Sequence, residues 1–329
     1  MKAHECRLAA ACAVVLLTVG VVALTPSEAD GAAASYFGWV TNSKGGTVSV
    51  IDLDTYEVVA THNVGAKPRG IKGAGDSLAV VAVQGANQVA VVDARTGVAE
   101  TFDVGRKPQD VALPSSAEFA YVSLLKEGMI QVITERGAGT KTQVGKRPGS
   151  MAYSANDKWI AVVNGGDGTV DVFGAGDLPS GRAPRMTLVI AKKPVTVAFH
   201  RKSKEIAVTS PTDGTVTIVN LKRGTVEDTV DVPGSPWGGA YSPTHNNTAA
   251  VSRMGADLVT IFSKDVSVDI EVGRKPKGLA FTPDGKRILV ANSASSSVSV
   301  IDVATATVLA TVDVGRGPFA VAITGSAER

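Results

Sequence analysis

A short phrase, Val-Gly-x-x-Pro, recurs along the whole chain and limits the possible folds more than any other feature. Clean copies end at Pro68, Pro108, Pro148, Pro276 and Pro318, and degraded copies end at Pro194 and Pro236. Successive prolines are 40, 40, 46, 42, 40 and 42 residues apart. A period near 42 residues is the length of four short strands with their turns, which is one blade of a β-propeller. The repeat therefore predicts a ring of four-stranded blades.

The last complete unit, residues 276–318, indicates how four strands fit into one repeat. We expect strands at 277–281, 287–291, 298–302 and 308–314, because these segments are apolar or alternate Val and Ile with small or polar residues. A turn is expected at 283–286, which places Pro and Gly where tight turns require them. A stack of helical repeats is excluded, because no segment keeps a 3.6-residue apolar period for three turns.

The two ends of the repeat are out of phase. Residues 37–41 match a second strand, whereas residues 319–324 match a first strand. We expect this C-terminal strand to pair with the N-terminal strands and complete a seventh blade, which leaves no open sheet edge. The predicted fold class is therefore all-β. It is a single seven-bladed β-propeller over residues 35–329, whose last blade is closed by a C-terminal first strand.

Several strands carry the motifs of a known repeat. Residues 39–42 (Trp-Val-Thr-Asn) and 290–292 (Val-Ala-Asn) fall in second strands, and residues 48–52 and 298–302 both have the sequence Val-Ser-Val-Ile-Asp. With the Val-Gly-x-x-Pro turn, these motifs resemble the YVTN-type β-propeller repeat over residues 36–325. The resemblance implies a scaffold and no single activity, because propellers of this kind include binding modules, lactonases and lyases. Residues 122–124 and 251–253 depart from the motif by replacing its Asn.

The first 34 residues differ from the repeats. Lys2 and Arg7 precede an apolar run at 8–24, and small residues follow. This order is typical of a secretory signal peptide over residues 1–34, with cleavage near residue 29 or 34. The alternative is an uncleaved membrane anchor, since the run is about 17 residues long. We therefore expect an exported protein, secreted or held in the periplasm or cell envelope, without a stable membrane span after cleavage.

Both cysteines, Cys6 and Cys12, fall in this N-terminal segment. The rest of the chain therefore has no disulfide, no thiolate metal site and no cysteine nucleophile. A domain of roughly 290 residues can bury a core large enough to be stable without such links. We expect this domain to be a monomer.

Basic residues concentrate at the repeat turns, although the formal net charge of the whole chain is only +2. In a four-stranded blade, these turns lie on the same face as the loops from second to third strands, at the mouth of the central channel. Of 33 Lys and Arg residues, twelve lie in or beside the turns: Lys67, Arg69, Arg106, Lys107, Lys146, Arg147, Lys192, Lys193, Arg274, Lys275, Lys277 and Arg316. The neighbouring loops add only a few acids: Glu127, Asp167, Asp213 and Asp257. The pattern predicts a positive ring for an anionic partner, or alternatively solvated residues of a turn that the fold needs.

The residue after each repeat proline begins the innermost strand, at the channel mouth. Around the ring these residues are Arg69, Gln109, Gly149, Val195, Trp237, Lys277 and Phe319. Four of them, Trp237, Lys277, Phe319 and Arg69, come from consecutive blades, so aromatic and basic side chains alternate. Such side chains can stack on bases or sugar rings while they pair with phosphates or carboxylates. Alternatively, Trp237 and Phe319 plug the channel end or pack between blades.

Groups suited to catalysis or metal binding are sparse. His62 is expected on an outer strand, and His200 and His245 in turns on the face opposite the mouth. Asp110 is the only acid two residues after a repeat proline, and the sequence suggests no metal-binding partner for it. There is no phosphate loop, nucleophile elbow or HExxH motif. We therefore predict no catalytic residue, no metal and no cofactor.

The longest repeat contains an insertion. Residues 174–185 lengthen the hairpin between its third and fourth strands. We interpret them as a surface loop that projects from the face opposite the basic ring and is tolerated there.

These features together favour a binding module. The expected ligand is an anionic polymer, either nucleic acid or acidic glycan, or an extracellular protein, and it binds on the basic face. The alternative is a lactonase-like hydrolase or lyase that acts on a small molecule in the channel. That activity requires convergent acids or a histidine in the channel.

Overall fold

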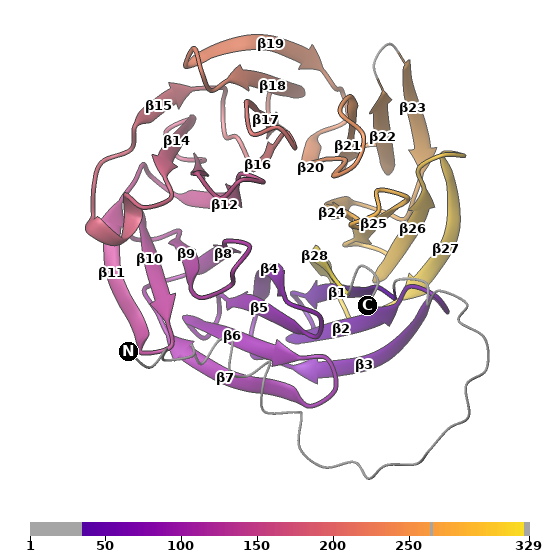
Figure 1. The fold of residues 1–329 in the computed structure, drawn as a ribbon. Coiled ribbons are helices and arrows are strands. Elements are labelled where there is room, and N and C mark those ends of the chain that lie inside the picture. Colours follow the sequence, from indigo (N-terminus) through magenta and orange to yellow (C-terminus); the bar gives the residue numbers. More distant parts are fainter. Residues whose placement is uncertain (1–34, 264–265, 326–329) are drawn as a thin grey trace, which may run out of the picture.

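The computed structural model describes residues 35–263 and 266–325. In these residues, seven four-stranded antiparallel sheets surround a central channel (Figure 1). The prediction of a seven-bladed β-propeller is confirmed. The predicted signal peptide at 1–34 lies outside the described residues, as do residues 264–265 and 326–329. No helix in the described ranges combines the length and the apolar character needed to cross a bilayer.

Each blade has its first strand at the channel and its fourth strand at the rim. Blade 1 consists of β28 (Pro318–Thr324), β1 (Phe37–Asn42), β2 (Thr47–Asp52) and β3 (Glu57–Asn63). Blade 2 consists of β4 (Pro68–Ala74), β5 (Leu78–Val83), β6 (Gln88–Asp93) and β7 (Gly97–Asp103). Blade 3 consists of β8 (Pro108–Ala112), β9 (Ala120–Leu124), β10 (Met129–Thr134) and β11 (Gly137–Gln143). Blade 4 consists of β12 (Pro148–Tyr153), β13 (Trp159–Asn164), β14 (Thr169–Gly174) and β15 (Met186–Val189).

The other three blades follow the same order. Blade 5 consists of β16 (Thr196–Phe199), β17 (Glu205–Ser210), β18 (Thr215–Asn220) and β19 (Thr225–Asp231). Blade 6 consists of β20 (Pro236–Tyr241), β21 (Thr248–Arg253), β22 (Leu258–Ser263) and β23 (Val266–Glu271). Blade 7 consists of β24 (Pro276–Phe281), β25 (Arg287–Asn292), β26 (Ser297–Asp302) and β27 (Thr307–Asp313).

Blade 1 closes the ring as the sequence predicts. β28 pairs antiparallel with β1, from Phe37 opposite Thr324 to Asn42 opposite Pro318, with one irregularity after Val40. The indole Nε1 of Trp39, which is fully buried, donates a hydrogen bond of 2.8 Å to Thr324 Oγ1. In Figure 1 the two strands lie side by side at the seam. The first and last described strands therefore form one sheet.

The repeat phrase has a packing reason. In blades 4 and 7, the motif Asn at the end of the second strand lies against the Gly of the preceding Val-Gly-x-x-Pro turn. A Cβ on Gly145 would come within 2.6 Å of the Asn164 side chain, and a Cβ on Gly273 within 2.6 Å of Asn292. The Asn292 amide donates to Ser299 Oγ at 2.9 Å. The turn position therefore requires glycine, because the Asn side chain occupies the space that a Cβ at this position would need.

The insertion at 174–185 does more than project into solvent. It forms a 3₁₀ turn, η1 (Leu178–Ser180), and Leu178 is 2% exposed within the core between blades 3 and 4. Thr142 Oγ1, on β11, donates to the Leu178 carbonyl at 2.8 Å. Asp177 is paired with Arg185 at 2.6 Å. Residues 180–183 are exposed, as expected of a surface loop, but the insertion also contributes a buried leucine to the interface between blades 3 and 4.

Candidate functional site

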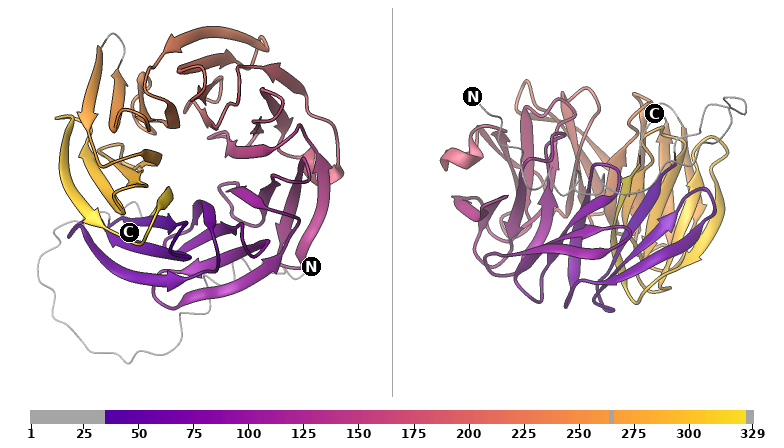
Figure 2. Two further views of the ribbon diagram at one scale, coloured as in Figure 1. Left: turned by 180° about the vertical axis from the view of Figure 1, so that it is seen from behind. Right: turned by 60° about the horizontal axis from the view of Figure 1, so that its bottom comes forward.

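The central channel contains a cavity of about 1190 Å³ that is lined by the inner strands of all seven blades. Figure 2 shows the ring of blades from the opposite face and in a view tilted by 60°. Every residue that follows a repeat proline lines this cavity: Arg69, Gln109, Gly149, Val195, Trp237, Lys277 and Phe319. These residues therefore line the channel, as the sequence predicts, whereas their part in ligand binding stays a prediction.

Four of these side chains contact one another. Lys277 Nζ lies 5.2 Å from the ring centroid of Trp237 and 5.0 Å from that of Phe319. The guanidinium carbon of Arg69 lies 4.5 Å from the Phe319 centroid. The two aromatic rings meet edge to face at 6.5 Å. We call Arg69, Trp237, Lys277 and Phe319 the mouth cluster, in which each cation lies within the usual cation–π distance.

Burial disfavours the charged forms of Arg69 and Lys277, the two cations of the mouth cluster. Burial lowers the pKa of Arg69. Burial also lowers the pKa of Lys277, and the nearby charges of Arg69, Lys44 and Lys275 lower it further. The buried Nε of Arg69 has no hydrogen-bond partner among the residues that the structure describes. A negatively charged group placed at the cluster would relieve the repulsion between the cations.

Hydrogen bonds from the preceding blades fix the backbone of the mouth cluster. Thr41 Oγ1 donates to the Arg69 carbonyl at 2.7 Å, and Thr209 Oγ1 donates to the Trp237 carbonyl at 2.6 Å. Ser252 Oγ donates to the Lys277 carbonyl at 2.5 Å. Each donor is the fifth residue of a second strand that packs against the next blade. The blade interfaces therefore set the positions of the side chains at the mouth.

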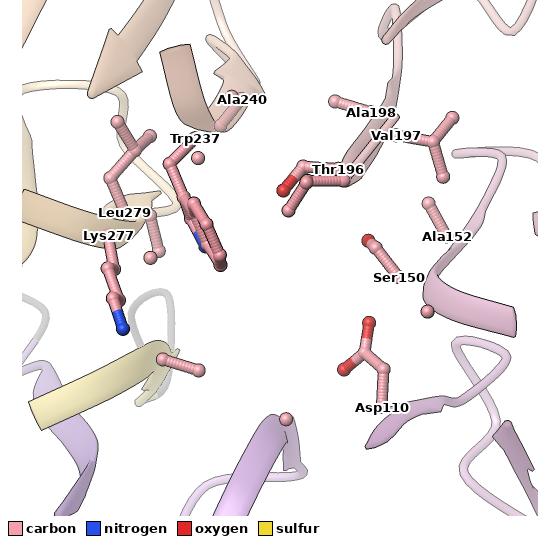
Figure 3. Close-up of a pocket in the computed structure, with 18 of the residues that line it drawn as sticks. Asp110, Ser150, Ala152, Thr196, Val197, Ala198, Trp237, Ala240, Lys277 and Leu279 are labelled. Carbon is pink, nitrogen blue, oxygen red and sulfur yellow. The ribbon is translucent and has the colours of Figure 1, made fainter. Parts of the chain in front are cut away.

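The opposite wall of the channel is polar. Asp110, Ser150 and Thr196, from blades 3, 4 and 5, face Trp237 and Lys277 across the cavity (Figure 3). Each stands two residues after a repeat proline, where the other blades have Gly70, Gly238, Gly278 and Ala320. Asp110 stands out in the sequence as the only acid at this position, and the hydroxyl groups of Ser150 and Thr196 become evident only when the seven repeats are aligned.

Asp110 also links two blades. Its carboxylate accepts hydrogen bonds of 2.9 Å from the backbone amides of Val111 and Met151. A Cβ on Gly70 would clash with the Asp110 carboxylate, so the glycine makes room for it. Burial raises the pKa of Asp110, and the positive charge of Lys72 partly offsets this effect. Lys72 also lines the channel, at a position where the other six blades have Ala.

The basic residues inside the turns are more exposed than the mouth cluster. Exposed side chains are found at Lys67, Arg106, Lys107, Lys146, Arg147, Lys192, Lys193, Arg274, Lys275 and Arg316. Among them, Arg147 and Lys193 also line the cavity. The structure therefore brings together two kinds of predicted residue, a half-buried cluster at one wall and an exposed ring around it.

The residue before each repeat proline has a left-handed backbone. The φ angles are 55° at Lys67, 57° at Lys107, 55° at Arg147, 53° at Lys193 and 53° at Lys275. The corresponding residues before Pro236 and Pro318 are Ser235, with a φ of 58°, and Gly317, with a φ of 65°. A side chain in this region costs about 1–2 kcal/mol relative to glycine. Five turns therefore have a basic residue where glycine fits better.

The acids near the ring have a structural use. Backbone amides of the turns donate to all four predicted loop acids: Arg106 to Glu127 at 2.6 Å, Lys146 to Asp167 at 2.6 Å, Lys192 to Asp213 at 2.8 Å and Lys275 to Asp257 at 2.8 Å. These carboxylates hold the turns in shape. This structural role of the four acids could not be read from their charge in the sequence.

Metal-binding and acid–base groups are not gathered at the channel. No cluster of three or more His, Asp or Glu residues suited to a metal ion occurs in the described residues. The described residues that line the channel cavity include no histidine, and Asp110 is the one acid among them. His62 lies on β3, and His200 and His245 follow the first strands of blades 5 and 6. The expectation that no metal, cofactor or catalytic residue is needed stays a prediction.

Comparisons with known proteins support the fold. No protein-family model and no curated protein matches the chain. A functionally unknown protein from Desulfotomaculum acetoxidans has a similar structure, with a TM-score of 0.72 and 14% identity over 86% of this chain and 99% of that one. Hydrazine synthase from Kuenenia stuttgartiensis gives a TM-score of 0.69 with 19% identity over 78% and 89% of the two chains. Streptogramin B lyase gives 0.66 with 13% identity over 80% and 88%. At these identities the likeness shows a shared β-propeller fold alone.

Proposed function

We propose that this protein is an exported binding module of the YVTN type, whose basic face binds an anionic polymer or an acidic segment of a protein. The observation that carries the proposal is the mouth cluster, where two cations and two aromatic rings converge at the opening of a large cavity. A ligand with negative groups and with bases or sugar rings fits both features, because it pairs with the cations while its rings stack on Trp237 and Phe319.

The exposed ring supports the same ligand class. Lys67, Lys107, Arg147, Lys193 and Lys275 occupy left-handed positions that disfavour them. A ring of charge around a concave opening attracts anions from solution and raises their association rate. Single-stranded nucleic acid and acidic glycan both carry the required charges and rings. Export and a monomeric state belong to the same proposal, because they rest on residues 1–34 and on the closed ring of blades.

A salt titration with a labelled oligothymidylate tests the proposal. With roughly −0.7 in log–log slope for each neutralised phosphate, four contacts would lose a factor of about fifty in affinity between about 50 and 200 mM salt. The double variant Lys275→Ala, Lys277→Ala should make the slope shallower by about 1.4. Trp237→Ala should weaken binding by ~1–3 kcal/mol without changing the slope if the indole stacks on a base.

The matched control is Lys222→Ala. Lys222 is exposed in the turn between β18 and β19, on the face opposite the mouth, so its loss should leave both affinity and slope unchanged. A heparin-type sulfated glycan in place of the oligonucleotide distinguishes the two polymers. Equal binding by wild type and both mouth variants, or no binding of either polymer at low salt, would show that the ring is only solvated turn structure.

A hydrolase or lyase that acts on a small molecule is the second candidate. Asp110 favours it, because a carboxyl group with a raised pKa faces the mouth cluster across the cavity. Both Asp110 oxygens accept backbone hydrogen bonds, which suits a structural tie between blades better than proton transfer. A panel of lactones tests this candidate. Turnover that Asp110→Asn abolishes without lowering the melting temperature would favour the enzyme.

A further inference from the structure

A second cavity opens between blades 5 and 6. Its volume is about 690 Å³, within the range of about 300–1,000 Å³ that small-molecule sites occupy. Its floor contains Ala207, Ile218, Gly239, Ala249 and Phe262, and the loop after β16 provides part of its lining. We call this cavity the 5/6 cleft. The proposed function does not use it.

The core is thin at this blade interface. Among the residues that the structure describes, each of the other six interfaces contains a cluster of nine to twelve buried hydrophobic residues. Between blades 5 and 6, the cluster formed by the described residues contains three: Val216, Val232 and Val251. The surrounding Ala207, Ile218 and Phe262 are only partly buried. The apolar surface at this interface is therefore left open, although the repeat elsewhere covers it.

The first cause of the thin core is a glycine on the inner strand of blade 6. Three residues after the repeat proline, the other blades have Ile71, Val111, Met151, Val197, Leu279 and Val321, all of which are buried. Blade 6 has Gly239 there. A Cβ on Gly239 would lie 3.1 Å from Thr209 Cγ2, so a small side chain nearly fits. Gly239 has no left-handed φ that would require glycine.

The second cause is a pair of alanines on the second strands. Ala207 of blade 5 and Ala249 of blade 6 occupy the positions whose side chains pack against each other between neighbouring blades. At the other interfaces at least one of the two residues is valine or larger, as with Ala161 and Ile206, which share one core cluster. Leu289 would clash with a side chain at Gly38, which shows the same complementarity. Between blades 5 and 6, both residues of the pair have small side chains, so neither fills the interface.

The rim of the cleft is polar and mainly cationic. Lys202 and Lys204 are exposed at the lining, and Glu205 is the acid beside them. His200 Nε2 lies 2.6 Å from the Asn246 carbonyl, and the His200 ring meets Tyr241 edge to face at 5.2 Å. These contacts tie together the two loops that border the opening. Burial raises the pKa of Tyr241, and the charge of Glu205 raises it further, so the phenol stays protonated as a donor.

We propose that the 5/6 cleft binds a small amphipathic anion, with its apolar body against Ala207, Gly239 and Ala249 and its negative head at Lys202 and Lys204. The small side chains of the floor leave apolar surface exposed, which a hydrocarbon or aromatic group of the ligand would cover. The two lysines give the opening the charge that an anionic head requires. None of the four mouth-cluster residues lines the cleft, although Gly239, Ala240 and Tyr241 line both cavities. The polar rim of the cleft comes from the loops that follow the first strands of blades 5 and 6.

Two fluorescent probes test the proposal on the full-length protein. The first is 8-anilinonaphthalene-1-sulfonate, which has an aromatic body and an anionic head. The second is N-phenyl-1-naphthylamine, which has a similar body without the charge. We expect saturable one-to-one binding of the sulfonate. The double variant Lys202→Ala, Lys204→Ala should weaken its binding about three- to tenfold and leave the uncharged probe unaffected.

The decisive variant fills the floor. Ala249→Ile places at this position the residue that blade 5 has in Ile206 and blade 7 in Ile288. It should abolish binding of both probes and raise the melting temperature by about 2–4 °C, because it fills an existing cavity. Ala249→Ser is the matched control, since it keeps the cleft empty and should retain binding. Trp237→Ala removes a competing aromatic surface at the mouth and should also retain binding.

Three results would overturn the proposal. The first is binding of the sulfonate that survives Ala249→Ile, which would place the probe elsewhere. The second is binding that disappears with Trp237→Ala, which would place it at the mouth cluster. The third is a lowered melting temperature for Ala249→Ile, which would mean that blades 5 and 6 close together in solution and leave no cleft.

Discussion

Removal of residues 318–329 should unfold the propeller or leave it close to unfolding. The deletion takes away β28, and with it the packing of Val321 and Ile323 in the core and the contacts of Phe319 with the mouth cluster. Burial of three such side chains contributes at most about 5–9 kcal/mol. The fully buried Trp39 would also lose the acceptor of its indole N–H, which costs ~1–3 kcal/mol. The total is comparable with the ~5–15 kcal/mol that holds a typical domain folded.

Urea denaturation followed by tryptophan fluorescence measures this loss. Trp39 lies at the seam and reports on it directly. Thr324→Val isolates the hydrogen bond and should lower the free energy of unfolding by ~1–3 kcal/mol. Deletion of only residues 326–329 keeps all of β28 and serves as the control. A deletion of 318–329 that unfolds at the wild-type urea midpoint would refute the seam as the closing contact of the ring.

Two further predictions concern the mouth and the insertion. Because burial and neighbouring cations lower the pKa of Lys277, this lysine loses its proton at a lower pH than ordinary lysines. Oligothymidylate affinity at constant salt should therefore fall as pH rises through that lowered pKa, and Lys277→Arg should remove the early fall; an unchanged pH profile in that variant would contradict the assignment. Leu178→Ala should destabilise the fold by ~2–5 kcal/mol in urea titrations, because the side chain is 2% exposed. Leu309→Ala, at 46% exposure, should change the stability by less than about 0.5 kcal/mol, and equal losses for the two variants would contradict the packing of η1.

The features that the sequence predicted are those that each repeat encodes within itself. The strands, the turns and the residue after each proline follow from local alternation and from the period of the repeat. The placement of Arg69, Trp237, Lys277 and Phe319 at the channel follows from the same register. The closing strand was predictable because an unpaired first strand at one end matched a missing first strand at the other.

The features that the sequence did not predict depend on contacts between side chains of neighbouring blades. Leu178 packs against β11 of the preceding blade, and the carboxylate of Asp110 reaches Met151 of the following one. Such contacts join residues about one repeat apart, and periodicity alone does not say which side chains meet. The 5/6 cleft shows the same limit, since Ala207 and Ala249 are unremarkable separately and leave a cavity only as neighbours.

The seam also determines the order in which the chain can fold. Trp39 and Thr324 are separated by 285 residues, so β1 has no partner on its inner edge until nearly all of the chain has emerged. Contacts between segments so distant in sequence raise the contact order, and a high contact order makes folding slow. Blades 2 to 7 each consist of consecutive strands and can form in turn. We therefore expect an open arc of six blades to precede the ring, with β28 docking in the final and slowest step.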